Sequence, residues 1–239
     1  MSSAMTGTNP SISPAKRGPS IALADAYLLL YNSACAMGWN LTLYKIFSAL
    51  LETGHVRGAV EATHDYVVVL QLVSTLELVH ALVGLVKSNP MNVLMQVLGR
   101  DLALFLVVTA FPPVRDSPWV LLMFSAWATS EVIRYPFYAL NIAGMCPRAL
   151  QWLRYTAFIV LYPLGFAGEL GTWIVGLPHI KAVGLPGLPG LPEGSSIYVL
   201  YAYIVFAFAI GAPKLYMHMI RQRRKQLGVA AGGGKVKAS

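Results

Sequence analysis

The stretch WLRYTAFIVLYPLGFAGE, from Trp152 to Glu169, is an apolar run that carries ionisable side chains. A carboxylate at the centre of a bilayer costs about 2.5–3.5 kcal/mol or more, so an ionisable residue in a spanning segment predicts a functional site. Tyr162 precedes Glu169 by seven residues. Because two helical turns cover about 7.2 residues, both side chains leave nearly the same face, roughly 10 Å apart along the axis. A phenol and a carboxylate that face one cavity are a candidate acid–base pair.

The composition around this stretch predicts a polytopic membrane protein. Of the 239 residues, 56% are hydrophobic and only 12% are charged, against about 25% charged residues in soluble domains. So few charges cannot cover the surface of a soluble domain. The two cysteines, Cys35 and Cys146, allow neither a disulfide framework nor a metal-binding spacing. The net charge of +8 is concentrated at the C-terminus, which indicates contact with an anionic membrane surface and argues against nucleic-acid binding.

The hydrophobic segments predict an all-α fold, a bundle of six transmembrane helices within a single domain at residues 21–219. Residues 1–20 predict a disordered N-terminal tail, and residues 220–239 a basic tail. We expect polar loops at residues 52–65 and at residues 176–196, where a GLP triplet occurs three times. The expected spans are residues 22–43, 66–86, 91–111, 119–140, 150–175 and 197–217.

Further charged residues lie inside the predicted spans. Glu77 and His80 are three apart on one helical face, which predicts a buried hydrogen-bonded pair, because a metal site of the di-iron type needs further carboxylates. Arg100 can pair with Asp101 or Glu77, or reach a substrate. Glu131 and Arg134, again three apart, can neutralise one another; Pro136 follows them and predicts a kink.

The basic residues predict which side the ends of the chain occupy. Six spans place both termini on one side of the membrane. Eleven lysines and arginines fall on that side, and three (Arg57, Arg115 and Lys181) fall on the other. The excess predicts cytoplasmic termini. The final residues, with Lys235 and Lys237, resemble the KxKxx retrieval signal of endoplasmic-reticulum membrane proteins, so we expect a multi-pass protein of that membrane.

Several strings in this sequence resemble the very-long-chain 3-hydroxyacyl-CoA dehydratases, a family also called protein-tyrosine-phosphatase-like, of which the PASTICCINO proteins are members. The similarity covers roughly Tyr27 to Met217, although Gly99 stands where a serine is expected. Glu77 and His80 also match the family. The strings are Tyr27-x-x-x-Tyr31-Asn32 with Gly38-Trp39, then Glu131-Val132-Ile133-Arg134-Tyr135-x-Phe137-Tyr138, Trp152-Leu153-Arg154-Tyr155-Thr156, and Leu161-Tyr162-Pro163-x-Gly165-x-x-x-Glu169.

The resemblance implies dehydration of a long-chain or very-long-chain 3-hydroxyacyl-CoA to a trans-2-enoyl-CoA in the fatty-acid elongation cycle. It implies Tyr162 and Glu169 as catalytic residues, with membrane lipid and the elongase and reductase enzymes of that cycle as partners. Burial favours Glu169 as the base, and a phenol is the natural acid, although the reverse roles or an intervening water stay open. No cofactor and no metal is expected. Supporting or substrate-contacting residues are expected at Glu77, Arg100, Glu131, Arg134 and Arg154.

Three other functions compete with this interpretation. A cysteine phosphatase needs an HCx5R loop, but the residues six positions beyond Cys35 and Cys146 are Leu41 and Trp152, which argues against that activity. A small transporter or channel also uses intramembrane charges and kinked helices, although the two halves of the sequence show no repeat. The third alternative is a non-catalytic scaffold that holds elongation enzymes together.

Overall fold

The computed structural model describes residues 19–184 and 195–232, and within these ranges the chain forms six long helical stretches without a strand. The predicted N-terminal tail before residue 19, the GLP triplets after residue 184 and the KxKxx-like end lie outside the described residues. The stretches are α1 (Pro19–Thr53), α2 with α3 (Val56–Ser74, Leu76–Leu82), α4 with the π-helical η1 (Pro90–Ala103, Leu104–Thr109), α5 (Pro118–Ile142), α6 with α7 (Arg148–Arg154, Phe158–Val183), and α8 with the π-helical η3 and α9 (Ser196–Phe206, Ala207–Gly211, Ala212–Gly232).

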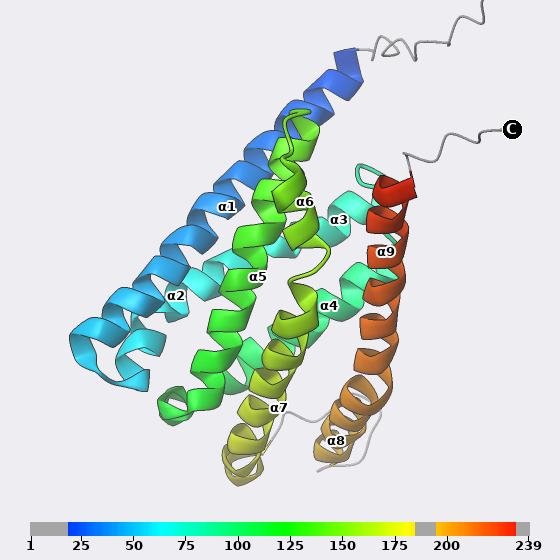
Figure 1. Ribbon diagram of the computed structural model, residues 1–239. Coiled ribbons are helices and arrows are strands. Elements are labelled where there is room, and N and C mark those ends of the chain that lie inside the picture. Colours follow the sequence, from blue (N-terminus) through cyan, green and yellow to red (C-terminus); the bar gives the residue numbers. More distant parts are fainter. Residues whose placement is uncertain (1–18, 185–194, 233–239) are drawn as a thin grey trace, which may run out of the picture.

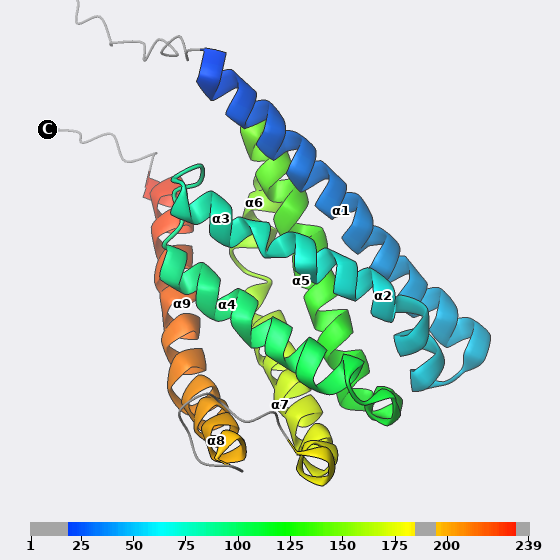
Figure 2. The same cartoon turned by 180° about the vertical axis from the view of Figure 1, so that it is seen from behind.

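The helices form a polytopic bundle in which α5 lies between α1 and α7 (Figure 1). Seen from behind, α2, α3 and α4 cross the other face of α5, and α8 with α9 stands at the side (Figure 2). The start of α1 and the end of α9 lie at the same end of the bundle, as six passes require. Four stretches, namely α2–α3, α4–η1, α6–α7 and α8–α9, are long and apolar enough to cross a membrane; α1 and α5 are the other two long helices, with 35 and 25 residues.

Prolines and short polar side chains set several helix boundaries. Pro90 and Pro118 open α4 and α5, where a missing N–H costs nothing. The preceding residues cap these helices, because Asn89 accepts a hydrogen bond from the backbone N–H of Met91 and Ser117 accepts one from that of Trp119.

Two predicted loops were wrong. The loop expected at residues 52–65 shrinks to a turn at Gly54, whose φ of 68° favours glycine, and α2 already begins at Val56. The loop expected from residue 176 starts later, because α7 continues through Pro178 to Val183. The basic run near residue 220 lies inside α9, which ends at Gly232.

A close approach between α5 and α7 fixes the centre of the bundle. A Cβ added to Gly168 would lie 2.6 Å from the backbone nitrogen of Met123, so only glycine allows the two backbones to come this close. Small residues at membrane helix interfaces act in this way. The contact holds Glu169, the next residue on α7, beside the part of α5 that follows Met123.

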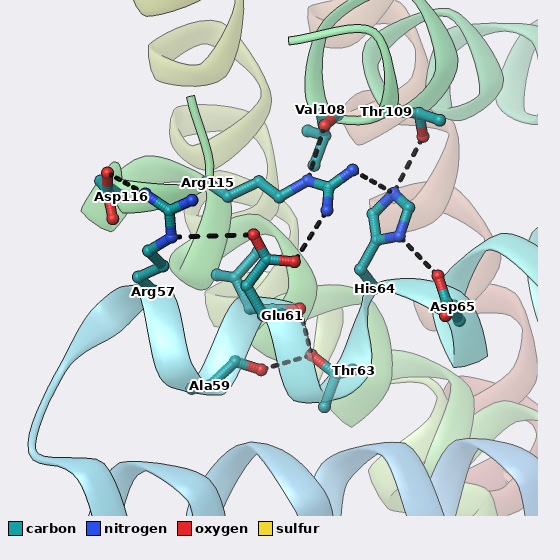
Figure 3. Close-up of polar contacts among 11 residues, drawn as sticks. Arg57, Ala59, Glu61, Thr63, His64, Asp65, Val108, Thr109, Arg115 and Asp116 are labelled. Atoms are coloured by element: carbon teal, nitrogen blue, oxygen red, sulfur yellow. Dashed lines mark hydrogen bonds and ion pairs between the residues drawn. The ribbon is translucent and has the colours of Figure 1, made fainter. Parts of the chain in front are cut away.

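A polar cluster lies at the end of the bundle opposite the described termini. Its members are Arg57, Glu61, His64 and Arg115, and we call it the far-end cluster (Figure 3). The Glu61 carboxylate of α2 lies between Arg57 and Arg115, at 3.8 and 2.8 Å. Arg115, on the 3₁₀ turn η2 (Pro112–Asp116), also donates to the carbonyl oxygen of Val108 at 3.0 Å and to His64 Nε2 at 3.4 Å. The far-end cluster therefore ties the connection between α4 and α5 to α2.

Candidate functional site

A stripe of polar and aromatic residues runs along α5 and organises the interior of the bundle. Its members are Trp127, Glu131, Arg134 and Tyr138, spaced by four, three and four residues, which places them on one helical face. Each bonds to a different helix: Trp127 to α7, Glu131 to α4, Arg134 to α3 and Tyr138 to α6. The stripe is therefore the polar axis around which the other helices are arranged.

Glu131, the carboxylate of the stripe, is almost fully enclosed, at 2% exposure. It accepts a hydrogen bond from Arg100 Nη1 at 2.5 Å and another from Arg134 Nε. The pairing of Glu131 with Arg134 confirms the ion pair predicted from their spacing. Arg100 pairs with Glu131 and not with either of the two acids considered in the sequence. Two cations therefore face one buried acid.

Arg134 also binds a second acid, Glu77 of α3, in a bidentate contact with distances of 2.5 and 2.8 Å. The hydroxyl of Tyr135 donates to the same carboxylate at 2.6 Å. The predicted pairing of Glu77 with His80 was wrong, because Glu77 bonds to residues of α5 and His80 bonds to a residue of α1. The His80 ring instead bonds to the Tyr27 hydroxyl of α1 at 2.9 Å. Glu77 is thus part of the stripe network.

Arg154 joins the network at the end of α6. Its Nη2 donates to the Tyr138 hydroxyl at 3.1 Å, and its guanidinium lies 5.6 Å from the centre of the same ring. The fifth span was predicted to be one continuous helix, but it is interrupted directly after Arg154. There the backbone N–H groups of Thr156 and Ile159 donate to carbonyl oxygens three residues back, and not four as in an α-helix. This break turns α6 onto the end of α5, so Arg154 can reach Tyr138.

Glu169 lies on α7, partly buried, with its Oε1 accepting a hydrogen bond from the Trp127 indole at 2.8 Å. Arg100 and Tyr203 both interact electrostatically with this carboxylate. Tyr203 is on α8, beside Gly99 of α4: a Cβ on that glycine would lie 3.5 Å from the Tyr203 hydroxyl. Side chains from three other helices, α4, α5 and α8, therefore lie near Glu169.

Tyr162, two turns before Glu169, points to a different neighbour. Its hydroxyl donates to the carbonyl oxygen of Ala212 at 3.1 Å. Ala212 follows the π-helical η3 and precedes Pro213, a residue whose missing N–H removes one donor from the helix. The Tyr162 ring stacks on Phe166 at 5.8 Å and lies 5.6 Å from the ring of Tyr216. The phenol thus links α7 to α9.

The two residues are near enough for the charge of Glu169 to act on Tyr162, but their hydrogen bonds go to different helices. Two open cavities occur elsewhere. One, of about 760 Å³, is at the α1–α2 turn and is lined in part by Arg57 and Glu61. The other, of about 210 Å³, lies between α5 and α6 beside Cys146. Neither of these two is the shared cavity expected for the pair. Hydrogen bonds of catalytic groups often form fully only when substrate is bound.

Sequence reasoning missed Trp127, Tyr203 and the carbonyl of Ala212 as neighbours of the proposed pair. Trp127 had a detectable signal, because it lies four residues before Glu131 and so on the face of the charged residues. The other two had none, since nothing in a single sequence tells which face of α8 or α9 turns to α7. Among the described residues, no group of three or more His, Cys, Asp or Glu side chains is placed to hold a metal ion.

Comparison with known proteins gives consistent matches. The sequence profile described as "Protein tyrosine phosphatase-like protein, PTPLA" matches residues 71–229. "Very-long-chain (3R)-3-hydroxyacyl-CoA dehydratase 1" of Mus musculus is 34% identical over 209 residues, which cover 86% of this chain and 74% of the relative. The dehydratase 2 of Homo sapiens is also 34% identical, with 86% and 82% covered.

A plant relative extends the similarity to nearly its whole length. "Very-long-chain (3R)-3-hydroxyacyl-CoA dehydratase PASTICCINO 2A" of Oryza sativa subsp. japonica is 33% identical over 219 residues, covering 89% of this chain and 98% of the relative. No solved structure matches the chain.

Proposed function

The chain belongs to the protein tyrosine phosphatase-like family, and from this premise we propose that it removes water from a 3-hydroxyacyl-CoA to form a trans-2-enoyl-CoA. The similarity to relatives named as very-long-chain (3R)-3-hydroxyacyl-CoA dehydratases supports the proposal. The observation that carries it in the structure is the placement of Tyr162 and Glu169 two turns apart on α7. A dehydratase needs one group that takes a proton and one that gives it.

In the proposed mechanism Glu169 is the base and Tyr162 the acid. The carboxylate takes the proton from C2, which the thioester makes acidic, and the electrons of that bond form the C2–C3 double bond. The C3–O bond breaks as Tyr162 protonates the departing hydroxyl, and water leaves. The proton on Glu169 then returns to the phenolate, directly or through water. The reaction is an elimination without oxidation or reduction, so the proposal includes no cofactor beyond the CoA that the substrate carries.

The mechanism requires the substrate hydroxyl to displace the Ala212 carbonyl from Tyr162. A phenol that donates to a backbone carbonyl already has its proton aimed at an acceptor, so the exchange replaces one acceptor with another. Arg100 and Glu169 both contact the Trp127 indole, and from there the arginine charge can stabilise negative charge that develops on the thioester oxygen. Glu131, Arg134 and Glu77 hold Arg100 and α5 in place, and we propose for them a supporting role.

The CoA moiety would lie at the end of the bundle that holds both described termini. α6, which carries Arg154, and the last part of α9, which carries the basic run from Arg221 to Lys225, lie toward that end, and these side chains suit phosphate groups. The apolar acyl chain would extend between helices toward the far-end cluster. We propose that this end faces the cytoplasm, that the membrane is the endoplasmic reticulum, and that the elongase and reductase enzymes of the elongation cycle are partners.

The word phosphatase in the family's description does not fit the cysteines of this chain. Cys35 is 2% exposed within the core, where a phosphoprotein cannot reach it. Cys146 lies in the turn before α6 and has Trp152, not arginine, six residues later. Neither thiol has the phosphate-binding loop that such chemistry requires.

The test uses purified protein in lipid vesicles with a long-chain 3-hydroxyacyl-CoA, and measures the enoyl product by chromatography. Tyr162→Phe and Glu169→Gln should each lower turnover at least 100-fold, because one proton-transfer group typically contributes a factor of about 10²–10⁴ to the rate. Tyr198→Phe is the matched control, because that tyrosine on α8 is 72% exposed. Turnover that survives both site substitutions in folded protein would refute the assigned residues and favour the transporter or scaffold alternatives.

A further inference from the structure

We propose that Trp127 is a positioning residue for Glu169, an inference that rests on the proposed function. The indole N–H donates to Oε1 of the carboxylate at 2.8 Å. With Oε1 occupied, Oε2 is the oxygen that takes the C2 proton of the substrate. Trp127 touches no reacting atom, and it acts by fixing which carboxylate oxygen is free and where it lies.

The indole is itself held firmly, as a positioning group must be. Trp127 is 2% exposed, and its ring stacks on Phe124, one turn earlier on α5, with 6.3 Å between centroids. The guanidinium of Arg100 lies 5.3 Å from the indole centre on the side of α4. Contacts from its own helix and from a neighbour therefore restrict the ring, so the N–H has a fixed direction.

Arg100 connects this arrangement to the charged stripe. Its Nη1 is bound by Glu131 at 2.5 Å, and Glu131 is in turn bound by Arg134. A cation over an aromatic ring draws electron density from it, which makes the indole N–H a stronger donor to a carboxylate. The chain from Glu131 through Arg100 and Trp127 to Glu169 thus transmits the rigidity of the buried ion pairs to the proposed base.

A glutamate needs such a restraint more than most catalytic groups. Its terminal torsion is broad and nearly two-fold, so a carboxylate on α7 without a partner can present either oxygen in several directions. The backbone contact at Gly168 sets the height of Glu169 against α5, and the Trp127 hydrogen bond then sets the rotation of the carboxylate. Small errors in the position of a reacting group cost about 100-fold in rate.

The test compares Trp127→Phe, which keeps an aromatic ring but removes the N–H, with Trp39→Phe. Trp39 is the matched control because it is equally buried, at 1% exposure, and its Nε1 has no hydrogen-bond partner among the described residues. We expect Trp127→Phe to lower kcat by about 10- to 100-fold with KM changed less than about 3-fold. Trp39→Phe should leave kcat within about 2-fold of wild type.

A substrate deuterated at C2 separates positioning from a loss of folded protein. If Trp127 places the base, proton abstraction is slower in Trp127→Phe, so single turnovers with enzyme in excess must be slower than in the wild type, and slower again with the deuterated substrate. A smaller amount of active protein would lower the apparent kcat but leave the single-turnover rate constants unchanged. Unchanged single-turnover rate constants, or a kcat within 2-fold of wild type, overturn the inference while the loss of activity in Glu169→Gln leaves the proposed function standing.

A spectroscopic measurement covers the case in which Trp127→Phe does not fold. Ultraviolet resonance Raman bands of indole report N–H hydrogen bonding, and the chain has five tryptophans. Removing the acceptor in Glu169→Ala must weaken the hydrogen bond of one of them. Identical spectra of the wild-type and Glu169→Ala proteins would overturn the inference. Wild-type protein that shows this spectral change but does not dehydrate the substrate would instead contradict the proposed function alone.

Discussion

Replacing Glu131 with glutamine should destabilise the bundle more than any other single change of charge in the stripe. The substitution keeps the shape of the side chain but leaves Arg100 and Arg134 facing a neutral amide. Arg134 retains its bidentate contact with Glu77, whereas Arg100 loses the carboxylate that binds its Nη1. Removing one partner of a buried ion pair costs about 3–5 kcal/mol. Because the Arg100 side chain is 25% exposed, we expect a loss of about 3 kcal/mol in the free energy of unfolding.

The measurement is reversible unfolding by sodium dodecyl sulfate in mixed micelles, followed by tryptophan fluorescence. Glu52→Gln, at an exposed position near the end of α1, is the control and should stay within about 0.5 kcal/mol of wild type. The double variant Glu131→Gln with Arg100→Gln removes both members of the pair. It should be more stable than the sum of the single effects predicts, by at least about 1 kcal/mol.

Two results would refute the reasoning about Glu131. The first is a Glu131→Gln protein as stable as the Glu52→Gln control, which would mean that water or lipid headgroups solvate the two arginines. The second is strict additivity of the single and double variants, which would mean that Arg100 and Glu131 do not interact in the folded protein.

Three further substitutions test other parts of the structure by the same unfolding assay. Gly168→Ala should cost about 1–3 kcal/mol by overpacking against the α5 backbone, whereas Gly99→Ala meets only an ordinary contact at 3.5 Å and should stay near wild type; equal effects would contradict the close approach. Arg115→Met replaces a side chain that is 13% exposed and should lower the free energy of unfolding by about 1–3 kcal/mol. Arg57→Met, at a half-exposed position, should lower it by at most about 1 kcal/mol. Tyr162→Phe should lose about 0.5–1.5 kcal/mol with its hydrogen bond to α9, and unaltered stability would show that this bond does not form.

The sequence predicts the six helical stretches because each needs only a long apolar run, a property of neighbouring residues. The loop boundary before α2 fails for a physical reason. Arg57, Glu61 and Asp65 form a polar helical face, and in isolation such a face looks like a loop. Partners from η2, 54 and 59 residues away in the chain, are what allow that face to be part of a helix. Tertiary pairing of this kind is invisible to local hydropathy.

The candidate site was predictable only as far as single helices extend. The spacing of Glu131 and Arg134 identifies a pair on one helix, and the structure confirms it. The contacts of Arg100 with Glu131 and of Arg134 with Glu77 depend on how four helices are rotated and shifted against one another. The same dependence hid the separate hydrogen bonds of Tyr162 and Glu169. Their assignment as the catalytic pair, and the cytoplasmic position of the termini, stay predictions.

The α5 stripe has a consequence for biosynthesis. Glu77 and Arg100 enter the bilayer on α3 and α4, ahead of the residues of α5 that neutralise them. Until Glu131 and Arg134 arrive, two ionised side chains remain in the nascent bundle without their final partners. The fourth hydrophobic segment, α5, should therefore leave the translocon together with its predecessors, and a chain truncated before it should be recognised and degraded by membrane quality control.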